Sequence, residues 1–98
     1  MSVTVSRNRN GIHKFMAVFP DGYKVHFGRQ GYSDYTKHKD KERMERYLTR
    51  HRRRENWTRS GAKTAGFWSR WILWSSPTLS GAVSKTSKIL GKKILLKY

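Results

Sequence analysis

The sequence predicts an α+β fold: a small three-stranded antiparallel β-ribbon covered by two helices, with an extended basic C-terminal tail. Three observations predict it. Residues 1–28 alternate apolar and polar side chains between two glycine-containing turns, and residues 64–75 hold three of the four tryptophans. Beyond Pro77, serine, threonine, glycine and lysine dominate. We therefore divide the 98 residues into a body, 1–77, and a tail, 78–98.

The ribbon is predicted from two loops of the same design, Asn8–Ile12 and Phe19–Tyr23. In each, glycine comes third in a three-residue connection, where a type I turn needs a left-handed residue. This register puts the large apolar side chains on one face, with the predicted pairs Phe19–Tyr23, Ala17–Val25, Phe15–Phe27, Val5–Phe15 and Val3–Ala17. A sheet of three strands needs a helix on its apolar face to be stable.

A first helix is predicted over residues 37–55, after a loop rich in capping residues. Its apolar stripe has the spacing i, i+3, i+4, i+7 and consists of Met44, Tyr47, Leu48 and His51. Acidic residues come early in this segment and arginines late, which suits the helix dipole. We expect the stripe to cover the apolar face of the ribbon.

A second helix is predicted over residues 64–75, with Thr64 as its cap and Pro77 beyond its end. It is apolar on nearly every side, so it must be buried or held by a partner. We predict that it serves as an aromatic anchor for another protein, with the contact residues Trp57, Phe67, Trp68, Trp71 and Trp74.

The tail is expected to be ordered only by a partner. Its eight large apolar residues contribute ~12–24 kcal/mol if fully buried. Fixing the backbone of its 21 residues costs ~20–40 kcal/mol. The residues predicted to contact the partner are Lys92, Lys93, Ile94, Leu95 and Leu96.

Charge is the strongest global signal, with 22 Lys and Arg against 6 Asp and Glu, a net charge of +16. All six acids lie between Asp21 and Glu55, and none follows. Such a balance favours an anionic partner: nucleic acid, an anionic membrane face or an acidic protein surface. The predicted contacts are Arg50, Arg52, Arg53, Arg54, Arg59 and Lys63. A solvated helix end would explain the first four equally well.

The sequence predicts no enzyme, no cofactor and no metal site. Cysteine is absent, and the four histidines are 12 or 13 residues apart. Asp34 and His38 could form a dyad, but no activated nucleophile or oxyanion loop accompanies them. The longest apolar run, Trp71 to Trp74, is far too short to cross a membrane. The basic and apolar end of the tail could still lie on an anionic leaflet.

Several motifs between Phe27 and Leu79 carry a family resemblance: Gly-Tyr-Ser-Asp-Tyr-Thr at 31–36, His-Lys-Asp at 38–40, Glu-Asn-Trp at 55–57 and Thr-Ala-Gly-Phe-Trp-Ser-Arg-Trp at 64–71. The segment resembles a family of short basic proteins encoded by large nucleocytoplasmic DNA viruses of the phycodnavirus and mimivirus kind. The resemblance implies a virus-encoded, virion-associated protein and supplies no catalytic residues.

Together these observations predict a minor capsid, or cement, protein of a large DNA-virus particle. It would be made in the host cytoplasm and would tie neighbouring subunits together in the virion. Its expected partners are the major capsid protein and other minor capsid proteins, with possible contacts to nucleic acid or an anionic inner membrane. The alternative is a basic DNA-binding protein associated with the packaged genome.

Overall fold

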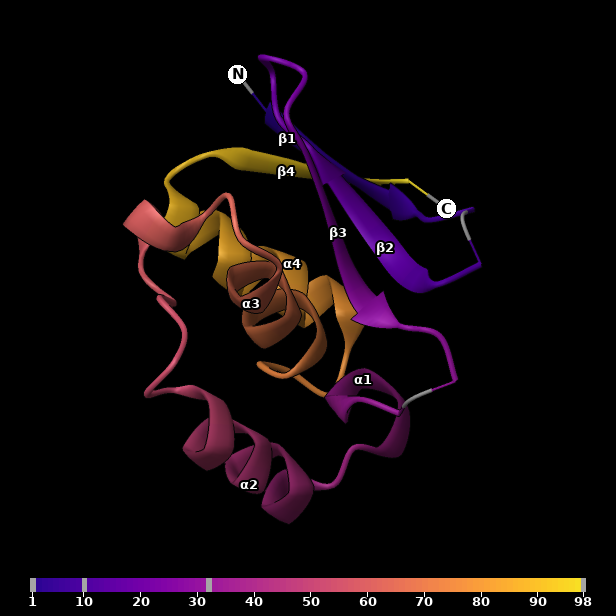
Figure 1. Ribbon diagram of the computed structural model, residues 1–98, viewed down its shortest axis with the longest axis vertical. Helices are drawn as coiled ribbons and strands as arrows, with labels where there is room; N and C mark the ends of the chain where they lie inside the picture. The colour runs from indigo at the N-terminus through magenta and orange to yellow at the C-terminus, as the bar shows by residue number, and fades with distance from the viewer. Residues whose placement is uncertain (1, 10, 32, 98) are drawn as a thin grey trace.

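The computed structural model describes residues 2–9, 11–31 and 33–97. It is an α+β fold built on one mixed four-stranded sheet in the order β3-β2-β1-β4 (Figure 1). The strands are β1 (Ser2–Arg7), β2 (His13–Val18), β3 (Lys24–Arg29) and β4 (Lys93–Lys97). Strands β1 to β3 run antiparallel, and β4 pairs parallel with β1. The prediction of a three-stranded antiparallel ribbon with an extended tail is therefore wrong.

The C-terminal segment supplies the fourth strand. After Pro77 the chain forms α4 (Leu79–Leu90), capped by the Thr78 hydroxyl and ended by Gly91 at φ 70°. It then returns as β4, where Ile94 lies opposite Val3 of β1. Our comparison of burial with entropy omitted the backbone hydrogen bonds of a helix and a strand, each a net ~0.5–1.5 kcal/mol. It also omitted the apolar surface and free sheet edge that the body offers.

The register of the β2–β3 hairpin agrees with the prediction, because Ala17 pairs with Val25 and Phe15 with Phe27. The β1–β2 pairing is shifted by two residues, so that Val5 lies opposite Ala17 rather than Phe15. The connection between these strands is longer than the predicted three residues. A shift of two residues keeps the same side chains on the core face.

The predicted helix over 37–55 is two helices, α1 (Tyr35–His38) and α2 (Lys41–His51). Lys39 takes a left-handed conformation at φ 55° and ends the first. The Asp40 carboxylate then accepts hydrogen bonds from the amides of Glu42 and Arg43 and begins the second. Asp40 is thus the N-cap of α2 rather than a residue inside one long helix.

The aromatic segment is shorter than predicted and not uniform. A 3-10 turn (Arg59–Gly61) leads to α3 (Ala65–Trp68), which continues as a π-helical turn (Ser69–Leu73). Thr64 caps α3, as expected, by accepting from the Phe67 amide.

The core lies between the sheet and the helices α3 and α4, which pack on one of its faces (Figure 1). Trp68 is fully buried and lies edge-on to Phe19, at 5.9 Å between ring centroids, and beside Phe27, at 6.0 Å. Its indole N–H donates to the Ala62 carbonyl at 2.6 Å. The aromatic segment and α4, and not α2, therefore cover the apolar face of the sheet.

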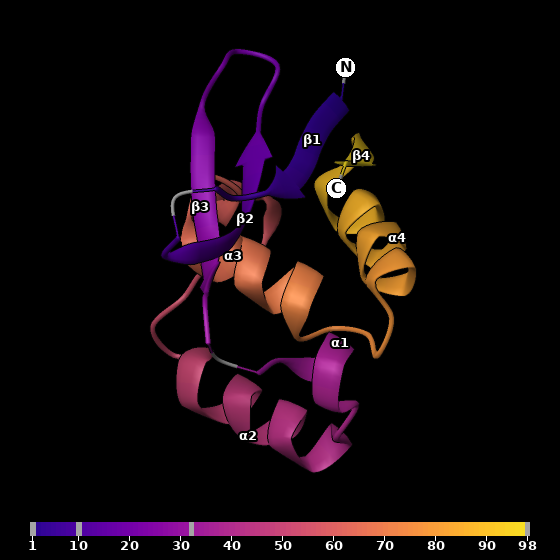
Figure 2. The ribbon, with the colours of Figure 1, turned by 90° about the vertical axis from the view of Figure 1, so that its right-hand side faces the viewer.

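Helix α2 lies at the opposite end of the molecule from the β2–β3 turn (Figure 2). Its Tyr47 ring stacks on Trp74 at 4.3 Å with an interplanar angle of 3°. The prediction that its apolar stripe covers the ribbon is wrong, because Tyr47, the buried residue of the stripe, packs on the end of the aromatic segment.

Candidate polyanion-binding face

The second face of the sheet carries no helix (Figure 1). Because strand residues alternate in direction, the side chains of β1, β3 and β4 on this face are those between the buried positions. The burial pattern of β2 is irregular, so its residues on this face are those paired with these positions of β1 and β3, whereas Lys14 is buried in an ion pair with Asp34. We call this face the outer face, and its residues are Ser2, Thr4, Ser6, Met16, Val18, Lys24, His26, Lys93, Leu95 and Lys97.

The outer face is basic at both rims and uncharged between them. Lys24 lies on the edge strand β3, and Lys93 and Lys97 lie on the opposite edge strand β4. All three are exposed. The two central strands contribute small hydroxyl and apolar side chains. None of the four strands contains an acidic residue. The lysines of this face therefore lie at its two edges, where they can attract an anion.

The spacing of the rims is comparable to the width of a nucleic-acid groove. Three interstrand steps of about 4.8 Å separate β3 from β4, or roughly 14 Å. The major groove of B-DNA is about 12 Å wide. Long lysine side chains at the two rims can thus reach the phosphates on either side of a groove.

The β1–β2 loop folds against β3 at one end of this face. The Asn8 amide nitrogen lies 2.5 Å from Nδ1 of His26, and the same amide donates to the Phe15 carbonyl. Arg9 in this loop is exposed. The loop thus adds positive charge next to the outer face and orients the His26 ring.

The predicted aromatic anchors have partners inside the chain. Phe67 and Trp68 are fully buried in the core. The indole of Trp71 donates to the Trp57 carbonyl at 2.8 Å, and that of Trp57 donates to Glu55 at 2.9 Å. With Trp74 stacked on α2, all five side chains contribute to holding the body together.

The predicted anion contacts fall into two groups. Arg50 in α2 and the three arginines after it, 52–54, are exposed at one end of that helix. None of these four forms an ion pair with any residue that the structure describes. Arg59 and Lys63 lie elsewhere, beside Lys92 of the α4–β4 connection.

The predicted tail contacts are divided by strand alternation. Ile94 is buried and Leu96 is partly buried against the core, whereas Lys93 and Leu95 point outward. The basic and apolar end of the tail, which could have lain on a membrane surface, is therefore the edge strand β4, with one face in the core. In the described chain, 2–9, 11–31 and 33–97, no helix is long and apolar enough to cross a membrane.

A polar cluster beneath α2 was not foreseen. Lys14 and Asp34 form a buried ion pair at 2.6 Å. His51 stacks on Tyr47 at 4.2 Å and lies 3.1 Å from the Glu55 carboxylate. Burial raises the pKa of the Tyr47 hydroxyl, with the nearby Glu55 charge acting in the same direction. A Lys14 on the polar side of a predicted strand gave no signal of this burial.

The Asp34–His38 pair considered as a dyad has other partners. Asp34 accepts from Lys14 and from Thr36, and His38 accepts from the Asp40 amide at 2.8 Å. Within the described part of the chain, no three His, Asp or Glu side chains are placed to hold a metal ion.

The amino-terminal half of the chain matches a family model. Residues 3–51 match a family of unknown function, DUF5754, and this match spans half of the 98 residues. The chain belongs to the DUF5754 family. The DUF5754 match includes nearly all of β1, all of β2 and β3, and the helices α1 and α2. No curated protein and no solved structure matches the chain.

Proposed function

We propose that this protein is a non-enzymatic structural protein of a large DNA-virus particle, and that it binds the packaged genome through the outer face. The lysine-rimmed, acid-free surface of the sheet carries this proposal. The viral setting rests on the resemblance of the motifs between Phe27 and Leu79. Genome binding takes precedence over the cement role because the tail, which was expected to be ordered only by a partner, forms part of the sheet.

The chemistry of the outer face suits binding without base reading. Lysine ammonium groups bind phosphates as point charges, and serine and threonine hydroxyls donate to phosphate oxygens. Of the side chains that read guanine or adenine in the major groove, Arg, Lys, Asn and Gln, the outer face contains only lysines, and these lie at its rims. The bound duplex would therefore be held by its backbone, with similar affinity for different sequences.

The test is the salt dependence of DNA binding, measured by fluorescence anisotropy with a duplex of about 20 base pairs. The variant Lys24→Gln/Lys93→Gln/Lys97→Gln removes the rims. If each lysine neutralises one phosphate, the slope of log K against log salt should become shallower by about 2.7.

The matched control is Lys41→Gln/Arg43→Gln/Lys88→Gln, which removes three exposed charges from α2 and α4. The control should keep most of the slope. Equal losses in both variants would show that net charge, and not the outer face, binds the DNA, and would overturn the proposal. Strong preference for one DNA sequence would contradict the backbone-only mode.

A minor capsid role is the second candidate, supported by the arginines at 50 and 52–54. Guanidinium groups bind carboxylates in a bidentate manner, so this cluster suits an acidic patch on a neighbouring subunit. Stepwise disruption of particles separates the two roles. Release with the DNA-containing core supports genome binding, and release with the shell supports the cement role.

A further inference from the structure

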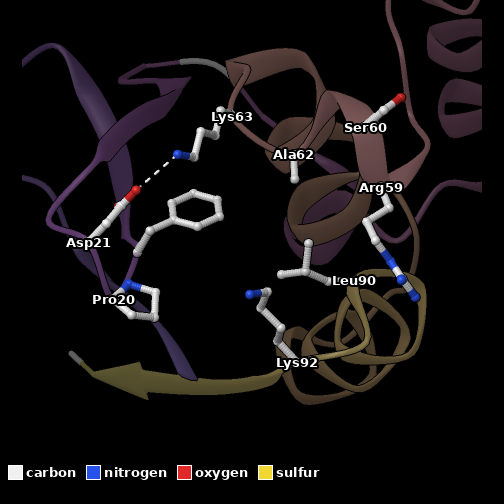
Figure 3. A pocket seen from close by; sticks show the side chains of 9 residues that line it. Pro20, Asp21, Arg59, Ser60, Ala62, Lys63, Leu90 and Lys92 are labelled. Atoms are coloured by element: carbon white, nitrogen blue, oxygen red, sulfur yellow. Dashed lines mark hydrogen bonds and ion pairs between the residues drawn. The ribbon is translucent and has the colours of Figure 1, made fainter. Parts of the chain in front are cut away.

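A pocket lies on the helix side of the molecule, between three segments distant in sequence. Its walls come from the end of the β2–β3 hairpin, the 3-10 turn with the residues after it, and the C-terminal end of α4 (Figure 3). Its volume is about 400 Å³, within the range of ~300–1,000 Å³ that small-molecule sites occupy.

The floor of the pocket is apolar. Phe19, Ala62 and Leu90 line it, and all three belong to the buried core. Pro20 adds an apolar wall at the hairpin. Because these side chains are fixed by the core behind them, the floor is preformed and can take an apolar group without rearrangement.

The rim of the pocket is cationic. Lys63 and Arg59 lie on either side, and Lys92 reaches in beside Leu90 (Figure 3). The lining contains one acid, Asp21, whose carboxylate is 3.0 Å from the Lys63 ammonium. In the part of the chain that the structure describes, Arg59 and Lys92 have no carboxylate partner. The rim therefore retains two uncompensated positive charges.

Two of these cations are held in place. The Arg59 guanidinium packs against Gly91, where a Cβ atom would lie 2.8 Å from it. The Lys63 ammonium lies 4.8 Å from the Tyr23 ring centroid and 5.6 Å from that of Phe19. The Tyr23 amide and then Lys63 lower the pKa of Asp21, so this carboxylate stays charged and keeps Lys63 at the rim.

We infer that this pocket binds an organic anion: an acidic group, carboxylate or phosphate, attached directly to an apolar body. The apolar body would lie on the floor formed by Phe19, Ala62 and Leu90. The acidic group would lie between Arg59 and Lys92, where its charge is balanced. An apolar carboxylate of this kind is presented by the C-terminal residue of a polypeptide, and an apolar phosphate by an organic phosphate ester. This inference is independent of the outer face.

The test is a titration of the ¹⁵N-labelled full chain by NMR with four small probes. N-acetyl-phenylalanine and phenyl phosphate carry an acidic group on an apolar body. N-acetyl-phenylalaninamide has the apolar body without the charge, and acetate has the charge without the body. The first two should shift the amides of Ala62, Lys63, Gly91 and Lys92 saturably, and the other two should bind at least about tenfold more weakly.

Saturation by the carboxylate alone would assign the site to a carboxylate, such as a peptide terminus, and saturation by the phosphate alone would assign it to a phosphate ester. The variant Arg59→Gln/Lys92→Gln should weaken binding by on the order of tenfold or more. The control Arg53→Gln/Lys88→Gln removes the same charge from other exposed sites and should bind normally. The NMR spectra of the free variants report their folding directly.

Two results would overturn the inference. One is equal binding of the neutral amide and the acid, which would leave no role for the cations. The other is the absence of saturable shifts at these four amides with either acidic probe. Loss of DNA binding by the outer face would not affect either measurement, so the two proposals fail separately.

Discussion

At the scale of single residues, the Lys14–Asp34 pair is the most buried of the three ion pairs between described residues. Their side chains are only 7% and 2% exposed. Asp34 also caps α1 by accepting from the Thr36 amide, so this carboxylate links β2 to the start of the helical layer. A buried charge that loses its partner retains the cost of its desolvation.

Replacing Lys14 with Met should therefore destabilise the fold by about 3–5 kcal/mol, measured by urea unfolding. The double variant Lys14→Met/Asp34→Asn should be less destabilised than the single one, because asparagine is neutral and still caps a helix. The control is Lys63→Met, which breaks the exposed pair with Asp21 and should cost at most about 1 kcal/mol. Equal costs for Lys14→Met and Lys63→Met would contradict the buried-pair account.

At the scale of elements, sequence patterns identified what is encoded locally. The β2–β3 hairpin and its register follow from the alternation of apolar and polar residues and from Gly22 in the turn, at φ 90°. The Thr64 cap followed from the residue type beside an apolar run. The fourth strand did not follow, because a parallel pairing of residues 93–97 with the amino terminus joins opposite ends of the chain. No local pattern specifies such a partner.

The signal for α4 was nevertheless present in the sequence. Leu79, Ala82, Thr86 and Leu90 follow a helical spacing between a threonine cap and a terminal glycine. Two small or polar members of this stripe, Ala82 and Thr86, are fully buried, and the Thr86 hydroxyl donates to the Ala82 carbonyl. Counting only large apolar residues concealed this amphipathic face. The outer face could not be predicted from the sequence for a different reason. Its lysines lie on β3 and β4, and only the strand order of the folded sheet places these two strands at opposite edges.

The attachment of α2 gives a prediction at the same scale. Its Tyr47 ring is sandwiched between Trp74 at 4.3 Å and His51 at 4.2 Å. Trp74→Ala should remove most of this contact and destabilise the protein by about 2–4 kcal/mol. Hydrogen exchange should show faster opening of the α2 amides than of the sheet amides. Trp74→Phe keeps an aromatic ring and should retain part of the protection; uniform loss across sheet and helix would contradict a local attachment.

At the scale of the whole molecule, the net positive charge destabilises the compact fold. A net charge of +16 on a chain with a radius of gyration of 12.4 Å places the cations close together. Only three ion pairs join described residues, and one of them depends on protonation of His51. Self-repulsion therefore opposes the compact state, and an anionic partner relieves it.

This self-repulsion predicts that salt stabilises the free protein. Raising the ionic strength from 0.01 M to 0.1 M shortens the screening length from about 30 Å to about 10 Å, which is shorter than the 36 × 28 × 23 Å extents of the molecule. The midpoint of thermal unfolding should rise over this range. Duplex DNA at low salt and at 100 times its Kd should stabilise the protein by a further ~2.7 kcal/mol and so raise the midpoint again. This stabilisation should disappear at higher salt, because salt weakens DNA binding. A midpoint that is constant or falls with salt would mean that the 22 basic residues are balanced within the fold, and the need for a polyanionic partner would disappear.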